Sequence, residues 1–185
     1  MSLEHAILGF VNERPRSGYD LKKAFDSSVA HFWPASQSQI YRTLDRLTKT
    51  GMVEVQVIQQ DGAPNRKVYH ITDTGVAALK KWLATSLPLT AWREAFFIQF
   101  YWADAITRDE LARLVEERAS RHKERREFFL SAMEHFKEIP PTGVWDKELQ
   151  PLIVEAGIAV EEAWLAWTER ALAKVKSLPN LNGDA

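Results

Sequence analysis

Hydrogen-bonding and cationic side chains are concentrated in one short segment of this chain, residues 36–46. The candidates for contact with DNA are Ser36, Gln37, Ser38, Gln39, Tyr41, Arg42 and Arg46. Arginine can bind guanine and glutamine can bind adenine through two hydrogen bonds each, and hydroxyl groups suit phosphate oxygens. These side chains on one exposed helix face would predict contacts in the major groove. The competing interpretation is that Ser36 and Gln39 only cap a helix and that the arginines are simply solvated.

A second pair of cations, Arg66 and Lys67, opens a later segment that is expected to form a strand. Cations on such a strand suit the sugar–phosphate backbone or the minor groove. We therefore expect Arg66 and Lys67 to contact DNA at the wing, with Lys67 contributing to the binding of all sequences alike.

Sequence patterns for catalysis or metal binding are absent from the chain. There is no cysteine, and the five histidines show no His-Glu-x-x-His spacing. There is likewise no Gly-x-Ser-x-Gly segment, phosphate-binding loop or dinucleotide fingerprint. We therefore expect no catalytic residue, no metal site and no cofactor, and an enzyme is the less favoured class of protein.

Large aromatic side chains crowd residues 92–102, and two more tryptophans follow at Trp164 and Trp167. Aromatic-lined cavities suit flat or phenolic ligands. One hypothesis is that Trp92, Phe96, Trp164 and Trp167 border a binding site for a small aromatic effector. The alternative is that these rings only pack the protein interior.

Hydrophobic spacing predicts the elements that would position the polar segment. Helices are expected over 2–12, from Ser17 onwards, over 36–50 and from Thr72 onwards, and strands over 53–58 and 66–71. In the third helix, Ile40, Leu44 and Leu47 define the inward face. Its outward face would carry Ser38, Gln39, Arg42, Thr43, Arg46 and Lys49. Three helices followed by a two-stranded wing make a winged helix-turn-helix.

The rest of the chain is expected to be entirely helical, so the fold class is mainly α. Helices are expected over 92–104, 107–137 and 149–176, with Pro151 tolerated only in a first turn. We expect a DNA-binding domain over 1–86, a helical dimerisation domain over 87–178 and a flexible tail over 179–185. A long apolar seam predicts a homodimer interface formed by Leu152, Ile153, Ala156, Val160, Trp164 and Trp167.

The distribution of charge agrees with this division. The net charge is −1, but Lys and Arg outnumber Asp and Glu in residues 1–85, and the reverse holds in residues 86–185. A basic excess in the first part suits a nucleic-acid partner. No apolar stretch is long enough to span a bilayer and no signal peptide is evident, so a cytoplasmic protein is expected.

Several short motifs occur in a fixed order within residues 1–85. They are Ser17-Gly18-Tyr19-Asp20-Leu21, Trp33, Ser36-Gln37-Ser38-Gln39-Ile40-Tyr41, Gly51-Met52-Val53, and the segment from Pro64 to Gly75 that leads to Trp82-Leu83. On these residues the chain resembles the PadR-like transcriptional regulators. The C-terminal part is similar to the helical dimerisation domain of the longer members, and the segment 152–176 is similar to their final dimer helix.

This resemblance implies a homodimer that binds an inverted-repeat operator, usually as a repressor. One departure concerns the reading helix, where the family usually has proline after the Ile-Tyr pair and this chain has Arg42. Because of this departure, the resemblance does not predict the target DNA sequence, but the predicted fold is unaffected. The alternative function is a winged helix that contacts proteins, which would show no sequence-selective and salt-dependent binding to DNA.

Overall fold

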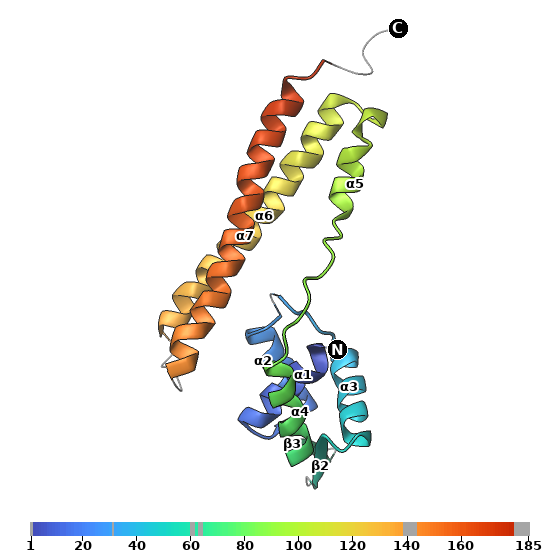
Figure 1. Ribbon diagram of the computed structural model, residues 1–185, viewed down its shortest axis with the longest axis vertical. Helices are drawn as coiled ribbons and strands as arrows, with labels where there is room; N and C mark the ends of the chain where they lie inside the picture. The colour runs from blue at the N-terminus through green and yellow to red at the C-terminus, as the bar shows by residue number, and fades with distance from the viewer. Residues whose placement is uncertain (1, 31, 60–61, 63–64, 139–143, 180–185) are drawn as a thin grey trace. The chain divides into compact units, whose positions relative to one another are not determined.

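The computed structural model describes residues 2–30, 32–59, 62, 65–138 and 144–179, with side chains at all of these positions except 135–138 and 144–147. Contacts between Cα atoms divide the chain into two compact units, Met1–Thr90 and Ala91–Ala185. Both units are mainly helical, and the first also contains a small antiparallel sheet (Figure 1). The expected mainly α fold class is confirmed. The tail predicted over 179–185 lies outside the described residues except for its first position.

The first unit has the order of elements of a winged helix-turn-helix. Its elements are α1 (Ser2–Glu13), β1 (Arg16–Ser17), α2 (Gly18–Ser27), α3 (Gln37–Lys49), β2 (Val53–Ile58), β3 (Arg66–Ile71) and α4 (Asp73–Leu83). Strand β3 lies between β1 and β2, and both pairings are antiparallel. The sheet therefore has three strands, where the sequence analysis expected a wing of two.

The additional strand β1 is only two residues long. Arg16 lies opposite Tyr69 of β3, and Ser17 lies opposite Val68. Two residues cannot produce the alternating pattern that identifies a strand in a sequence. They become a strand because β3 presents an unpaired edge to them.

Side-chain caps fix where the helices of the first unit begin. The Ser17 and Ser36 side chains each accept a hydrogen bond from the backbone N–H three residues later. The side chain of that later residue accepts in turn from the backbone N–H of the serine, which makes two capping boxes. Thr72 caps α4 and also donates its hydroxyl to the Gly51 carbonyl at 2.6 Å. Gly51 itself has a φ of +68°, the left-handed conformation that suits glycine after a helix.

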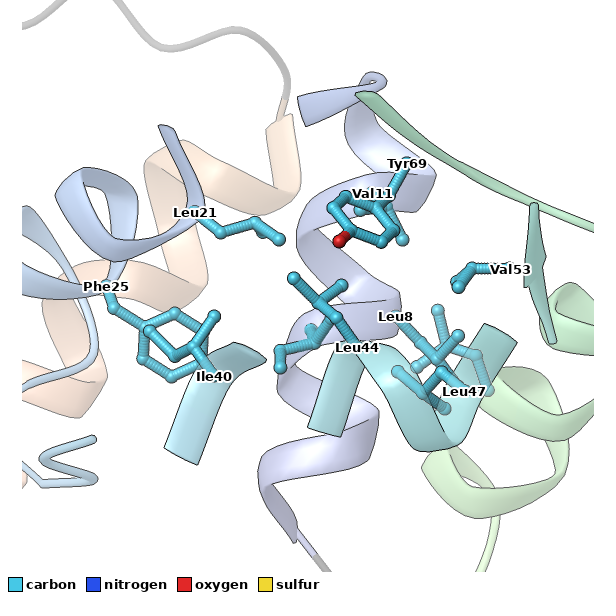
Figure 2. Close-up of a cluster of buried hydrophobic side chains, with 11 residues drawn as sticks. Leu8, Val11, Leu21, Phe25, Ile40, Leu44, Leu47, Val53 and Tyr69 are labelled. Carbon is cyan, nitrogen blue, oxygen red and sulfur yellow. The ribbon is translucent and has the colours of Figure 1, made fainter. Parts of the chain in front are cut away.

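A single hydrophobic core holds these helices against the sheet. Figure 2 shows side chains from α1, α2, α3, β2 and β3 meeting around Leu44, which is fully buried. Ile40, Leu44 and Leu47 form the buried stripe of α3, as expected. Thr43 was expected on the outer face but is only 4% exposed, because it lies beside Ile40 and Leu44 on the same inner side of the helix.

Two glycines allow elements of the first unit to approach closely. A Cβ atom on Gly75 would lie 2.1 Å from the carbonyl oxygen of Met52, so glycine lets the first turn of α4 contact the residue before β2. A Cβ atom on Gly18 would lie 2.5 Å from the ring of Tyr41. Tyr41 of α3 therefore packs directly over the start of α2.

The second unit contains a short helix and a long helical hairpin. Its elements are α5 (Ala95–Tyr101), a 3₁₀ turn η1 (Ala103–Ala105), α6 (Arg108–Glu138) and α7 (Val144–Lys176). α6 and α7 run side by side along most of their length (Figure 1). Thr107 caps α6 in a capping box with Glu110, at the position where the sequence predicts that this helix begins.

The boundaries of this unit differ from expectation in two places. The helix expected over 92–104 begins only at Ala95 and ends at Tyr101. α7 begins at Val144, so Pro151 lies in the helix interior and not in its first turn. Because proline has no N–H, the helix lacks the bond that residue 151 would donate to the carbonyl of residue 147. Among the described residues, no helix is long and apolar enough to cross a membrane.

Candidate nucleic-acid interface

The first turns of α3 present the densest group of the residues expected to contact DNA. Ser36, Gln37, Ser38 and Gln39 are all exposed. Ser36 and Gln39 form the capping box, with the Gln39 side-chain oxygen accepting from the Ser36 backbone N–H at 2.8 Å. The Ser36 and Ser38 hydroxyls lie 3.0 Å apart. The cap is therefore real, and because these side chains remain exposed, it leaves their hydroxyl and amide groups accessible to a ligand.

The next exposed positions of α3 carry the two arginines. Arg42 donates from Nε to the Ser38 carbonyl at 3.2 Å, which lays its side chain along its own helix. Arg46 forms an ion pair with Glu4 of α1. Tyr41 is 38% exposed and is held over Gly18, so its ring is partly packed while its edge reaches solvent. All three residues lie on α3, which is the helix that a winged helix-turn-helix places in the major groove.

The wing brings the remaining predicted contacts to one strand. Arg66 and Lys67 are both exposed at the start of β3, where β2 is their neighbour. Arg66 forms an ion pair with Asp20 of α2 at 2.6 Å. Hydrogen bonds from Ser17, together with Arg66, hold the pKa of the Asp20 carboxyl below its usual range despite partial burial. Neither carboxylate partner, Glu4 or Asp20, was predicted from the sequence.

The four residues of the expected effector site meet in one aromatic cluster of the second unit. Measured between ring centres, Trp92 lies 6.3 Å from Trp164 and Phe96 lies 6.0 Å from Trp167. The ring centres of the two tryptophans of α7 lie 5.7 Å apart. Of the four, Trp92 also lines an open hollow of about 740 Å³. The other residues that line it are Arg93, Glu94, Ala95, Phe97, Ile98, Tyr101 and Trp102. Phe96, Trp164 and Trp167 belong to the packed cluster, which is the structural role considered as the alternative.

A network of hydrogen-bonded polar side chains lies beside this cluster. Arg118 donates to Glu94 at 2.7 Å and to His122 at 2.9 Å, and its guanidinium lies 4.6 Å from the ring centre of Trp164. His122 in turn lies 2.5 Å from Glu161. Burial raises the pKa of Glu94, but the hydrogen bond and charge of Arg118 outweigh it and hold that pKa below its usual range.

Part of this side-chain network could be predicted from the sequence. Helical spacing along residues 107–137 predicts that Arg118, His122 and Arg125 lie on the inner face of α6, and His122 is indeed buried. The prediction is wrong for Arg125, because its side chain is 60% exposed. Its Nε atom lies 3.3 Å from a carboxylate oxygen of Glu161. Glu161 was missed, since no local pattern marks a glutamate that is only 1% exposed.

The residues of the expected dimer interface separate into two groups. Leu152, Ile153, Ala156 and Val160 form an exposed apolar stripe on α7. Trp164 and Trp167 pack instead against the aromatic residues of α5 in the same chain. Within the part of the chain that the structure describes, no group of three or more acidic or histidine side chains could hold a metal ion.

Comparison with known proteins agrees with this arrangement. Residues 7–81 match the transcriptional regulator PadR-like family, and residues 92–176 match the virulence activator alpha C-terminal family. The probable transcriptional regulator Rv1176c of Mycobacterium tuberculosis is 43% identical over 90 residues, which span 49% of this chain and 48% of that protein. The negative transcriptional regulator PadR of Bacillus subtilis is 25% identical over 94% of this chain and 97% of its own length.

Solved structures extend the likeness to 95% of the chain. Bacillus subtilis PadR in complex with operator DNA superposes with a TM-score of 0.82 at 26% identity, covering 95% of this chain and 99% of that one. The same protein in complex with p-coumaric acid gives a TM-score of 0.77 at 24% identity, covering 95% and 96%. This chain belongs to the PadR-like family of DNA-binding transcriptional regulators, which is not a family of enzymes, and its C-terminal region is of the virulence activator alpha type.

Proposed function

We propose that this protein is a homodimeric repressor that binds an inverted-repeat operator and is released by a small aromatic effector. The observation that carries the proposal is the likeness to operator-bound PadR, which covers 95% of this chain and therefore includes both units. In this proposal residues 1–86 bind DNA, and residues 87–178 form the dimer and receive the effector.

The reading surface is assigned to α3 and β3. Gln37, Ser38 and Arg42 have the hydrogen-bonding groups to read base edges. Ser36, Gln39 and Tyr41 suit phosphate oxygens near the start of the helix. Arg46 lies at the far end of α3, and Arg66 and Lys67 hold the wing on the backbone or in the minor groove.

The dimer is supported by the exposed stripe on α7. Val160 is 54% exposed, Leu152 is 54% exposed and Ile153 is 49% exposed. Neighbouring apolar residues with this exposure suit a partner surface. Two-fold symmetry then places two copies of α3 about one helical turn of DNA apart, roughly 34–36 Å, which matches an inverted repeat.

Selection of genomic DNA fragments by the purified protein tests the function directly. We expect enrichment of an inverted repeat whose half-sites are about 10 base pairs apart, centre to centre. Binding to this repeat should weaken linearly on a log–log plot as salt increases, because neutralised phosphates release counterions. Recovery of no sequence above background would overturn the proposed function and favour a protein-binding winged helix.

Arg42 and Lys67 are expected to contribute in different ways. Arg42→Ala should change the preferred sequence and cost about 1–3 kcal/mol on the operator, as the loss of a base contact does. Lys67→Ala should weaken binding to every sequence similarly and reduce the salt slope by about 1, as the loss of a phosphate contact does. Affinities measured on operator and unrelated duplexes at several salt concentrations separate the two. Identical behaviour of both variants would show that the roles of helix and wing are assigned incorrectly.

The effector proposal rests on the open hollow beside α5 and on the aromatic acid bound by PadR of Bacillus subtilis. Trp92 and Phe97 offer ring faces there, and Arg93 offers a cation. We expect p-coumaric acid to quench tryptophan fluorescence and to release the operator, whereas cyclohexanecarboxylic acid should do neither. Trp92→Ala should weaken the response at least several-fold. Absence of quenching across a panel of aromatic acids would remove the effector from the proposal.

A further inference from the structure

The cations expected to contact DNA differ in how they are held. Arg46 and Arg66 each form an ion pair with a carboxylate on a different element. Arg42 donates a hydrogen bond to the Ser38 carbonyl of its own helix, and Lys67 forms no ion pair within the part of the chain that the structure describes. We propose that Glu4 and Asp20 are positioning residues, which hold the Arg46 and Arg66 guanidinium groups ready for the operator and thereby raise discrimination between operator and other DNA. This inference rests on the proposed function.

Asp20 is itself firmly held, which makes it a suitable anchor. Its Oδ2 atom accepts from the Ser17 hydroxyl at 2.7 Å, from the Ser17 backbone N–H at 3.3 Å and from Arg66 at 2.6 Å. The Asp20 backbone N–H also donates to the Ser17 hydroxyl at 3.2 Å. The carboxylate cannot turn away without breaking the cap of α2, so Arg66 is bound to a fixed point on the helical part of the unit.

The wing strand needs such an anchor at this position. β3 pairs with β1 only at Val68 and Tyr69. Arg66 and Lys67 lie beyond that pairing, opposite Ile58 and Val57 of β2. A two-stranded ribbon is only marginally stable by itself. The ion pair between Arg66 and Asp20 therefore connects this end of the ribbon to α2.

Glu4 provides a similar anchor for α3. Its side chain is only 16% exposed, although it is a carboxylate, and it binds Nε of Arg46 from the first turn of α1. The Arg46 side chain is 56% exposed and the Arg66 side chain 48% exposed, so donors on both guanidinium groups still face solvent. Each arginine is thus oriented by a carboxylate and is still open to a DNA group.

Stability alone does not account for these two pairs, because half-exposed ion pairs contribute little to folding. Ordering a long side chain before binding does reduce the entropy that is lost when the complex forms. Each carboxylate also repels phosphate, which weakens attraction to all DNA alike. The two effects together raise the ratio of operator affinity to non-specific affinity.

The test is a double-mutant cycle in which the ratio of operator affinity to non-specific affinity is measured for each variant. Asp20→Asn should weaken binding to the selected operator about 3–10-fold, the range for one side chain that must be ordered on binding. Binding to a shuffled duplex of the same length and composition should stay equal or become tighter. In an Arg66→Ala background, Asp20→Asn should leave the ratio unchanged, because the group it positions is gone.

A second cycle combines Glu4→Gln with Arg46→Ala. It leaves the α2 cap intact, so its result does not depend on whether Asp20→Asn disturbs the fold. Matched controls lie on the same two helices. Asp26→Asn on α2 breaks a pair with Lys22, and Glu13→Gln on α1 breaks a pair with Arg16, and both should leave the ratio unchanged. Thermal unfolding of every variant identifies any that has lost its fold.

Two outcomes would overturn the inference. Equal tightening on both duplexes would mean that Glu4 and Asp20 only repel phosphate. An undiminished effect in the alanine backgrounds would mean that they act through the fold and not through the arginines. Discrimination by the wild-type protein reports on the proposed function itself, so failure of the function and failure of the positioning role are distinguishable.

Discussion

Val160→Arg is expected to convert the dimer to a monomer and to weaken operator binding by at least about 100-fold, because joining two half-site readers raises affinity by two to four orders of magnitude. Val160 is 54% exposed at the C-terminal end of the apolar stripe on α7. An arginine there would place an unpaired cation within the proposed dimer contact, which is costly. Sedimentation equilibrium and fluorescence anisotropy with a labelled operator measure the two effects.

A suitable control for this substitution is Ala166→Arg, at an exposed position of the same helix outside the stripe. This substitution adds the same charge and should leave the protein dimeric, with unchanged affinity for the operator. A variant at Val160 that remains dimeric with wild-type affinity would show that the stripe does not form the dimer. A monomer that binds the operator at full strength would show that dimerisation is unnecessary for reading it.

Glu161→Ala is expected to lower the free energy of unfolding by about 3 kcal/mol, because it leaves buried polar groups without an acceptor. Glu161 is 1% exposed and lies 2.5 Å from His122, which is itself 5% exposed. The substitution also leaves a small cavity between α6 and α7, which adds to the loss. Urea denaturation at one fixed protein concentration measures the change, since subunit association also contributes to stability.

The next residue, Glu162, supplies the matched control. It forms an ion pair with Arg126 at 3.3 Å, but its side chain is 53% exposed. Glu162→Ala should therefore cost less than about 1 kcal/mol, as exposed pairs do. Equal losses at residues 161 and 162 would contradict the importance of burial for the pair formed by His122 and Glu161.

Local patterns were sufficient to predict most of the first unit. The capping boxes at Ser17 and Ser36 and the stripe of Ile40, Leu44 and Leu47 involve residues only three or four positions apart. The strands β2 and β3 were likewise predicted at their observed bounds. Such signals depend on neighbours within one helical turn or on alternation along one strand, and the sequence contains both.

Contacts between distant segments could not be predicted in the same way. Glu4 is 42 residues from Arg46, Asp20 is 46 residues from Arg66, and Glu161 is 39 residues from His122. No periodicity links positions so far apart, and each carboxylate alone resembles an ordinary surface residue. The partners follow only from how α1, α2 and α7 pack against their neighbours.

Residues 160 and 161 illustrate both sides of this comparison. The sequence by itself determined that they lie on a long helix of a PadR-like regulator, since helical spacing and family motifs are local properties. Only the tertiary structure decided that the valine is exposed and the glutamate buried, the reverse of their usual preferences. The physical reason is that α6 presents His122 to one side of α7, where a hydrogen-bonding partner is favoured, and leaves the apolar stripe on another side uncovered.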